Sequence, residues 1–173
     1  MRKIEAPDSH HYNAASGWLE LGNRTECRIE LEAISPGNQS HPAVLDLKWA
    51  LCAAEQKWDE AFELAQQLMQ ACPKDAAGWL HAAYATRRRS SGGLVAAWEL
   101  LLPAADLFPE EPVIPFNLAC YACQMGQLDD GRRWFKRACA VGDKRKITAM
   151  ALQDQDLKPL WPELSANAKP GET

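Results

Sequence analysis

Two cysteines three positions apart, Cys120 and Cys123, form the C-x-x-C pattern that is typical of metal sites and of thiol chemistry. A structural zinc site needs four ligands, and the sequence has no second C-x-x-C and no histidine close by. A redox motif of this kind begins a helix after a strand, whereas both cysteines fall inside an apolar helical pattern, with Cys139 expected on the partner helix. We therefore expect no metal and no cofactor, and keep metal or thiol chemistry at Cys120 and Cys123 as an alternative.

The histidines offer little support for catalysis. His81 is the one histidine predicted to lie on a helix face that a ligand could reach, and no serine or carboxylate stands at a suitable spacing around it. The others lie near the N-terminus or in a turn, at His10, His11 and His41. Glycine-rich loops that cradle phosphates are also missing from the sequence. The sequence predicts a protein that is not an enzyme.

Composition narrows the class further. The chain has 173 residues and is 47% hydrophobic, which suits one compact domain or a short solenoid. Its net charge of −4 gives no reason to expect nucleic-acid binding. The first eight residues contain no apolar run, and charged residues and a proline interrupt the most apolar stretch, 93–108. We expect a cytoplasmic protein with reduced cysteines and with no membrane partner.

The elements that would position these residues follow from a repeat of small side chains. Such residues recur after 34, 36 and 34 positions, at Cys27, Ala61, Ala97 and Gly131. A small residue at a fixed period marks a place where two helices touch closely. The repeat predicts four helical hairpins, 8–41, 42–75, 76–111 and 112–145, with the two extra residues of the third hairpin in a polar turn at 87–93.

The ends of the chain carry weaker patterns. Apolar residues in 146–164 are suited to cover the last hairpin, with a short helix capped by Asp156. The segments 1–7 and 165–173 are predicted to be disordered.

Because Gly131 falls in a helix interior, Gly131→Ala is expected to stabilise the protein unless the contact is too tight for a methyl group.

Over residues 8–145 the chain resembles the tetratricopeptide repeat (TPR) proteins. The last hairpin matches most closely, with Asn117-Leu118-Ala119, Gly126, Asp129, Phe135 and Ala138. Two departures are Lys48, where leucine is usual, and Trp49, where glycine or alanine is usual. The resemblance implies an all-α fold, a right-handed α-solenoid of about four hairpins with a C-terminal capping helix, as a single domain over 8–164.

The resemblance also implies a function. In this family the first helices of the hairpins line a concave groove that binds a peptide or a helix of another protein. The groove residues would be Leu80, His81, Tyr84, Arg87, Arg88, Phe116, Asn117, Cys120 and Gln124. The alternative is that Tyr84 and Phe116 pack between neighbouring hairpins. The carboxylate clamp of some family members is not expected, because the comparable positions hold Asp46, Ala50 and His81.

We thus predict a non-enzymatic interaction module, a monomer or weak homo-oligomer, that binds another protein and no nucleic acid. A self-associating assembly and a secretion-type chaperone are the alternatives.

The distribution of charge leaves two interpretations of one segment open. Residues 132–146 hold seven basic residues and a single acid, Asp143. This basic patch could meet an acidic partner or nucleic acid, or it could be a solvated outer helix face, which we favour.

Overall fold

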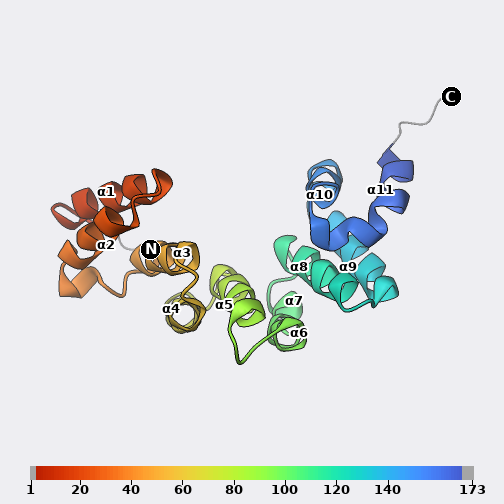
Figure 1. Ribbon diagram of the computed structural model, residues 1–173, viewed down its shortest axis with the longest axis horizontal. Helices are drawn as coiled ribbons and strands as arrows, with labels where there is room; N and C mark the ends of the chain where they lie inside the picture. The colour runs from red at the N-terminus through yellow and green to blue at the C-terminus, as the bar shows by residue number, and fades with distance from the viewer. Residues whose placement is uncertain (1–2, 169–173) are drawn as a thin grey trace. The chain divides into compact units, whose positions relative to one another are not determined.

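The computed structural model describes residues 3–168, and every regular element in that range is a helix (Figure 1). The predicted all-α fold class is therefore confirmed. The chain divides into two compact units, Met1–Arg89 (unit 1) and Ser90–Thr173 (unit 2). The predicted third hairpin, 76–111, spans this boundary, because its first helix belongs to unit 1 and the rest of it to unit 2.

Unit 1 consists of helices that pack on their neighbours in chain order (Figure 1). The first hairpin pairs α1 (Asp8–Glu20) with α2 (Arg24–Ala33), and the second pairs α3 (Pro42–Ala54) with α4 (Trp58–Ala71). A short 3-10 helix, η1 (Pro36–Asn38), joins the two hairpins, and α5 (Ala77–Arg88) packs on α4. Helices α1 and α2 lie within the segment 8–41, and α3 and α4 lie within 42–75.

The small residues lie where the hairpin helices approach most closely. Ala15, Cys27 and Ala61 have no exposed surface, so a larger side chain at any of them would push two helices apart. The turns reverse the chain through left-handed backbone, with φ of 77° at Gly22 and 60° at Gln56. Glycine adopts this conformation without steric cost, whereas glutamine does not.

A buried carboxylate closes the first hairpin. Asp8, the first residue of α1, accepts hydrogen bonds from the backbone N–H and the hydroxyl of Ser35 and from Nδ2 of Asn38. The hydrogen bonds from Ser35, and then that from Asn38, hold the pKa of Asp8 below its ordinary value. The start of α1 is thereby fixed to the segment that follows α2.

Unit 2 begins with a helix that a proline divides. Pro103 has no N–H to continue a helix, and α6 (Leu94–Leu101) ends before it while α7 (Ala104–Leu107) follows it. The hairpin of α8 (Val113–Gln124) and α9 (Leu128–Val141) comes next, with φ of 77° at Gly126 in its turn. Both α6 and α7 pack on α8.

Gly131 lies in a tighter contact than the sequence suggested. A Cβ atom built on Gly131 would stand 2.6 Å from the Sγ atom of Cys123, and Cys123 is buried. Two such atoms prefer to be about 3.5–4.0 Å apart. The condition attached to the sequence prediction is therefore met, and we no longer expect Gly131→Ala to stabilise the protein.

The C-terminal segment covers the last hairpin with α10 (Lys144–Ala151), the 3-10 helix η2 (Gln155–Leu160) and α11 (Trp161–Ala168). Leu157 and Leu160 are almost fully buried, and η2 packs on α8. The cap of η2 is Asp154 and not Asp156, because the Asp154 carboxylate accepts the backbone N–H of Asp156.

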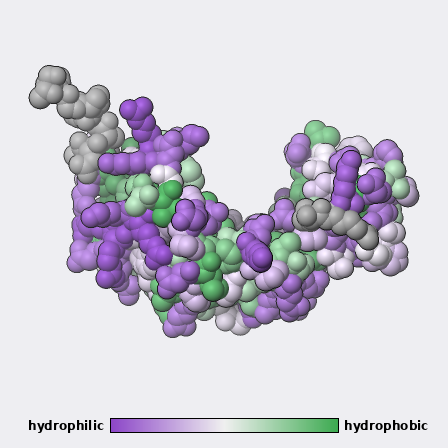
Figure 2. Space-filling view, turned by 180° about the vertical axis from the view of Figure 1, so that it is seen from behind, coloured by the Kyte–Doolittle hydropathy of each residue, from purple (hydrophilic) through white to green (hydrophobic). Residues whose placement is uncertain are grey.

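The predicted disordered ends fall partly outside the described residues. Residues 1–2 and 169–173 lie beyond them, whereas α11 continues to Ala168, inside the segment 165–173. None of the described helices is both long and apolar enough to span a bilayer. On the face drawn in Figure 2, hydrophilic residues cover most of the surface and hydrophobic residues form small patches.

Candidate partner-binding site

The predicted groove residues divide between the two units. Five of them lie on α5 in unit 1, at Leu80, His81, Tyr84, Arg87 and Arg88, and four lie on α8 in unit 2, at Phe116, Asn117, Cys120 and Gln124. The two groups differ in how much of their side-chain surface is open.

Unit 1 gathers four rings from α3, α4 and α5, here called the aromatic cluster: Trp49, Trp58, His81 and Tyr84. The Trp49 and His81 rings are stacked, with centroids 3.7 Å apart and an angle of 6° between their planes. Tyr84 lies edge-on to Trp49 at 5.8 Å and tilted to Trp58 at 5.8 Å. Rings in such contact are worth about 0.5–1.5 kcal/mol per pair beyond their buried area. The cluster is therefore a preformed surface and not a set of separate side chains.

An arginine lies on this cluster. The Cζ atom of Arg88 stands 3.4 Å from the centroid of the Tyr84 ring and 5.5 Å from that of Trp58. One Nη1–H of Arg88 is donated to the carbonyl oxygen of Tyr84 at 3.1 Å. Among the described residues no carboxylate pairs with Arg88. Its remaining N–H groups can therefore donate to a ligand while the aromatic rings hold the guanidinium in place.

An acid borders the cluster at His81. Asp46 accepts a hydrogen bond from His81, with 2.7 Å between Oδ1 and Nε2, and the Asp46 side chain is 57% exposed. Tyr84 is 39% exposed. The face thus combines a half-open aromatic surface with a cation and an anion, which suits an extended peptide or a helix.

The two tryptophans of the cluster were not among the predicted site residues. The signal for Trp49 was present in the sequence, because an indole stood where the TPR pattern has a small residue. In the structure its Nε1 is buried and has no hydrogen-bond partner among the described residues. Leu80 and Arg87, which were predicted, are half-buried on the same helix as Tyr84.

The α8 group is covered in part, because two of its four residues are buried while Gln124 is exposed. Phe116 and Cys120 are buried. Asn117 donates its Nδ2–H to the carbonyl oxygen of Val113 at 2.9 Å, and Gln124 donates to the carbonyl oxygen of Asp156 at 3.3 Å. The segment around η2 thus occupies part of the helix face that the sequence assigned to an open groove.

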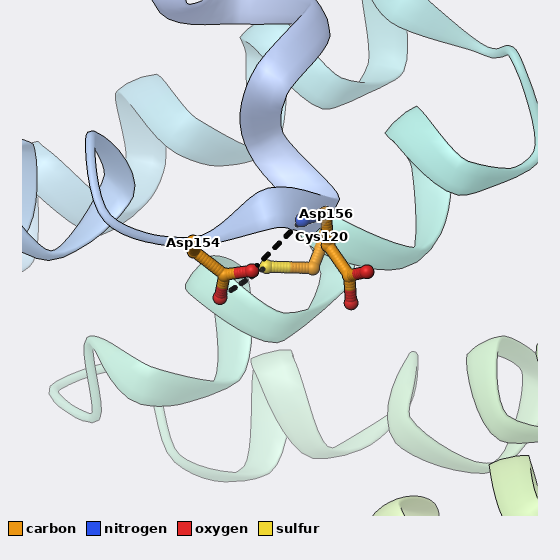
Figure 3. A group of neighbouring side chains, drawn as sticks. All are labelled: Cys120, Asp154 and Asp156. Carbon is orange, nitrogen blue, oxygen red and sulfur yellow. Dashed lines mark hydrogen bonds between the residues drawn. The ribbon is translucent and has the colours of Figure 1, made fainter.

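Cys120 meets two acids of this segment, Asp154 and Asp156 (Figure 3). One potential ligand atom from each residue lies within 4.8 Å of the others. The Cys120 thiol lies 3.6 Å from the Asp154 carboxylate, to which it donates. Burial, followed by the charges of Asp154 and Asp156, raises the pKa of Cys120 far above its ordinary value.

Those contacts favour a structural role for the group. The Cys120 thiol already donates to one oxygen of the Asp154 carboxylate. Asp154 already caps η2 through its other oxygen. Cys123 lies in the α8–α9 contact beside Gly131, so the two halves of the C-x-x-C have separate surroundings. We interpret the group as the connection that fastens η2 to α8.

Comparisons with known proteins bear on the fold. No protein-family model matches the chain, and no curated protein matches it. Among solved structures, the chain is similar to the one titled "MamA RS-1 ArsTM double mutant", a TPR-like protein, with a TM-score of 0.65 and 15% identity. The match covers 82% of this chain and 79% of that one. At this identity the likeness shows the fold alone: this chain has a TPR-like helical fold.

Proposed function

We propose that this chain is a non-enzymatic protein–protein interaction module that binds a peptide or helix of a partner protein on the α3–α5 face of unit 1. The observation that carries the proposal is Arg88 stacked on Tyr84 of the aromatic cluster, with Asp46 hydrogen-bonded to His81 of the same cluster. Tryptophan, tyrosine and arginine are enriched among the few residues that supply most of the affinity in protein interfaces.

The geometry supports a division of roles on this face. Tyr84 and Trp58 offer ring surface to an apolar side chain of the partner. Arg88 offers planar N–H donors to a carboxylate or a backbone carbonyl, and Asp46 offers an acceptor. Because the rings and the guanidinium already hold one another, binding would order few additional side chains. Asn117 and Gln124 on α8 remain proposed contributors to a groove.

A second candidate function is self-association. It is favoured by exposed apolar residues on α6 and α7 of unit 2, where Val95 is 59% and Leu107 60% exposed. Light scattering over a dilution series separates the two candidates. A mass that falls with dilution supports assembly, and a constant monomer mass supports the interaction module. In the proposal the chain is cytoplasmic, a monomer or weak homo-oligomer, and binds neither membrane nor nucleic acid.

The test begins with capture of partners by the full-length chain from its source cell and their identification by mass spectrometry. The affinity of each purified partner is then measured for the wild type, Tyr84→Ala and Arg88→Ala. Leu21→Ala is the matched control, since Leu21 is 77% exposed and lies outside the aromatic cluster. We expect Tyr84→Ala and Arg88→Ala each to weaken binding by about tenfold, as interface anchors do. Unchanged affinity in folded Tyr84→Ala and Arg88→Ala proteins would refute the assignment of this face.

A further inference from the structure

We propose a second, independent docking site, in unit 2, that takes an acidic segment of a partner protein. A cavity of about 240 Å³ is bordered by α9, α10, η2 and α11. Its lining combines apolar and charged residues, namely Phe135, Cys139, Leu160 and Leu164 with Arg132, Lys136, Lys144 and Glu163. One large apolar side chain of the partner would enter the cavity, and neighbouring carboxylates would meet the lysines.

Ion pairs within unit 2 neutralise much of the basic patch, 132–146. Arg132 forms a two-pronged pair with Glu163, with 2.9 Å and 2.6 Å between the closest nitrogen and oxygen atoms, and also contacts Asp129. Arg133 pairs with Asp130. Arg137 donates to the carbonyl oxygen of Ala105 and lies 3.4 Å from Asp106. These three arginines therefore act within the fold.

The two lysines that border the cavity are different. In the part of the chain that the structure describes, neither Lys136 nor Lys144 has an ion-pair partner. Glu163, the acid of the cavity wall, is already held by Arg132. Two like charges that border one apolar cavity repel each other, and an anion between them would relieve the repulsion.

The position of Lys144 supports this interpretation. It lies in the first turn of α10, where the helix dipole favours acids and disfavours cations. The charge of Lys144 therefore does not stabilise its own helix. Lys136 is an exposed residue of α9, so its ammonium group is also not needed for packing. A solvated helix face does not explain why both charges border the same cavity.

The size of the cavity indicates the kind of occupant. About 240 Å³ lies below the roughly 300–1,000 Å³ of pockets that enclose small-molecule ligands, but it admits a single leucine or phenylalanine side chain. Two unpaired lysines beside Glu163 are also a poor match for the continuous phosphates of a nucleic acid. A protein segment with an apolar anchor and flanking carboxylates fits both the shape and the charge.

The first experiment measures binding of a fluorescein-labelled synthetic peptide, Glu-Asp-Leu-Phe-Asp-Glu-Leu, by anisotropy with the full-length chain. The double variant Lys136→Glu/Lys144→Glu is compared with Lys74→Glu/Lys158→Glu, which changes the net charge equally at exposed lysines that do not line the cavity. We expect the first variant to bind about tenfold more weakly and the control within about twofold of the wild type. A peptide with Gln and Asn in place of Glu and Asp should also bind more weakly. Equal loss in both variants would overturn the proposal.

A second measurement needs no substitution. Cys139 lines the cavity and Cys72 lies in unit 1, and both are half-buried while the other four cysteines are buried. The acidic peptide should slow alkylation of Cys139 by N-ethylmaleimide severalfold and leave Cys72 unchanged, as mass spectrometry of tryptic fragments would show. Equal rates at Cys139 with and without peptide would contradict the site. The site would also be contradicted if polyuridylate RNA or phosphatidylserine vesicles bound more tightly than the acidic peptide and if that binding depended on Lys136 and Lys144. Because the proposed function concerns unit 1, either proposal can fail without the other.

Discussion

The contact between Gly131 and Cys123 gives a prediction that sequence rules alone would reverse. Alanine in a helix interior is ordinarily better than glycine by about 0.5–1 kcal/mol. Here the new methyl carbon would stand 2.6 Å from the Cys123 sulfur, and overpacking a buried contact costs about 1–3 kcal/mol. We therefore expect Gly131→Ala to lower the free energy of unfolding by about 1 kcal/mol.

Removing the sulfur should reverse the sign of this effect. Cys123→Ala alone leaves a small void and is expected to cost about 1 kcal/mol. In that background the methyl group of Gly131→Ala enters the vacated space, so the substitution should stabilise by about 0.5–1 kcal/mol. The coupling energy between the two sites, the difference between these two effects of Gly131→Ala, is then about 1.5–2 kcal/mol, well above the error of a double-mutant cycle.

Wild type, Gly131→Ala, Cys123→Ala and the double variant would be unfolded with urea, and circular dichroism at 222 nm would monitor the unfolding. Gly17→Ala is the matched control, since Gly17 lies inside α1 and a Cβ atom there would meet nothing within 4 Å. Gly17→Ala should stabilise the protein by about 0.5–1 kcal/mol, the ordinary difference between alanine and glycine in a helix. If Gly131→Ala stabilised the protein equally in both backgrounds, the close approach of α8 and α9 at this position would be refuted.

Three further predictions follow from local geometry. Gln56→Gly should stabilise by about 1 kcal/mol in thermal unfolding, because Gln56 has φ of 60° where Gly22 and Gly126 have 77° in the corresponding turns. The pKa of Asp8 is lowered in the folded protein, so the Asp8 carboxylate stabilises the fold above its ordinary pKa, and this stabilisation is lost as the pH falls below about 4. Asp8→Asn should therefore reduce the dependence of the melting temperature on acid pH. Because its pKa is raised, the Cys120 thiol should resist iodoacetamide at pH 8 until the protein unfolds. EDTA should leave the melting temperature unchanged, and a shift of the melting temperature with EDTA would show a bound metal at Cys120, Asp154 and Asp156 instead.

The hairpins could be predicted because close helix contacts leave a local mark. A position that must be small is small in every repeat, and the structure buries Cys27, Ala61 and Ala97 completely. The break at Pro103 was also readable in principle, since proline disrupts a helix wherever it falls inside one. The division of the chain at Arg89 was not readable, because it depends on contacts between distant segments.

The candidate site was predictable only in part, for a similar reason. His81, Tyr84 and Arg88 recur on one face of one helix, and helical spacing is enough to group them. The stack of Trp49 on His81 joins residues of different hairpins, and no local pattern encodes it. Phe116 and Cys120 were assigned to an open face, but both are buried, and the sequence could not show that η2 packs on their helix.

The boundary after Arg89 has a consequence for how this protein can change over time. The two proposed surfaces draw on separate stretches of sequence, one before the boundary and one after it. Substitutions that retune one of them leave every amino acid of the other intact. Selection can thus hold one specificity constant while the other drifts, and a gene fusion could inherit either stretch on its own.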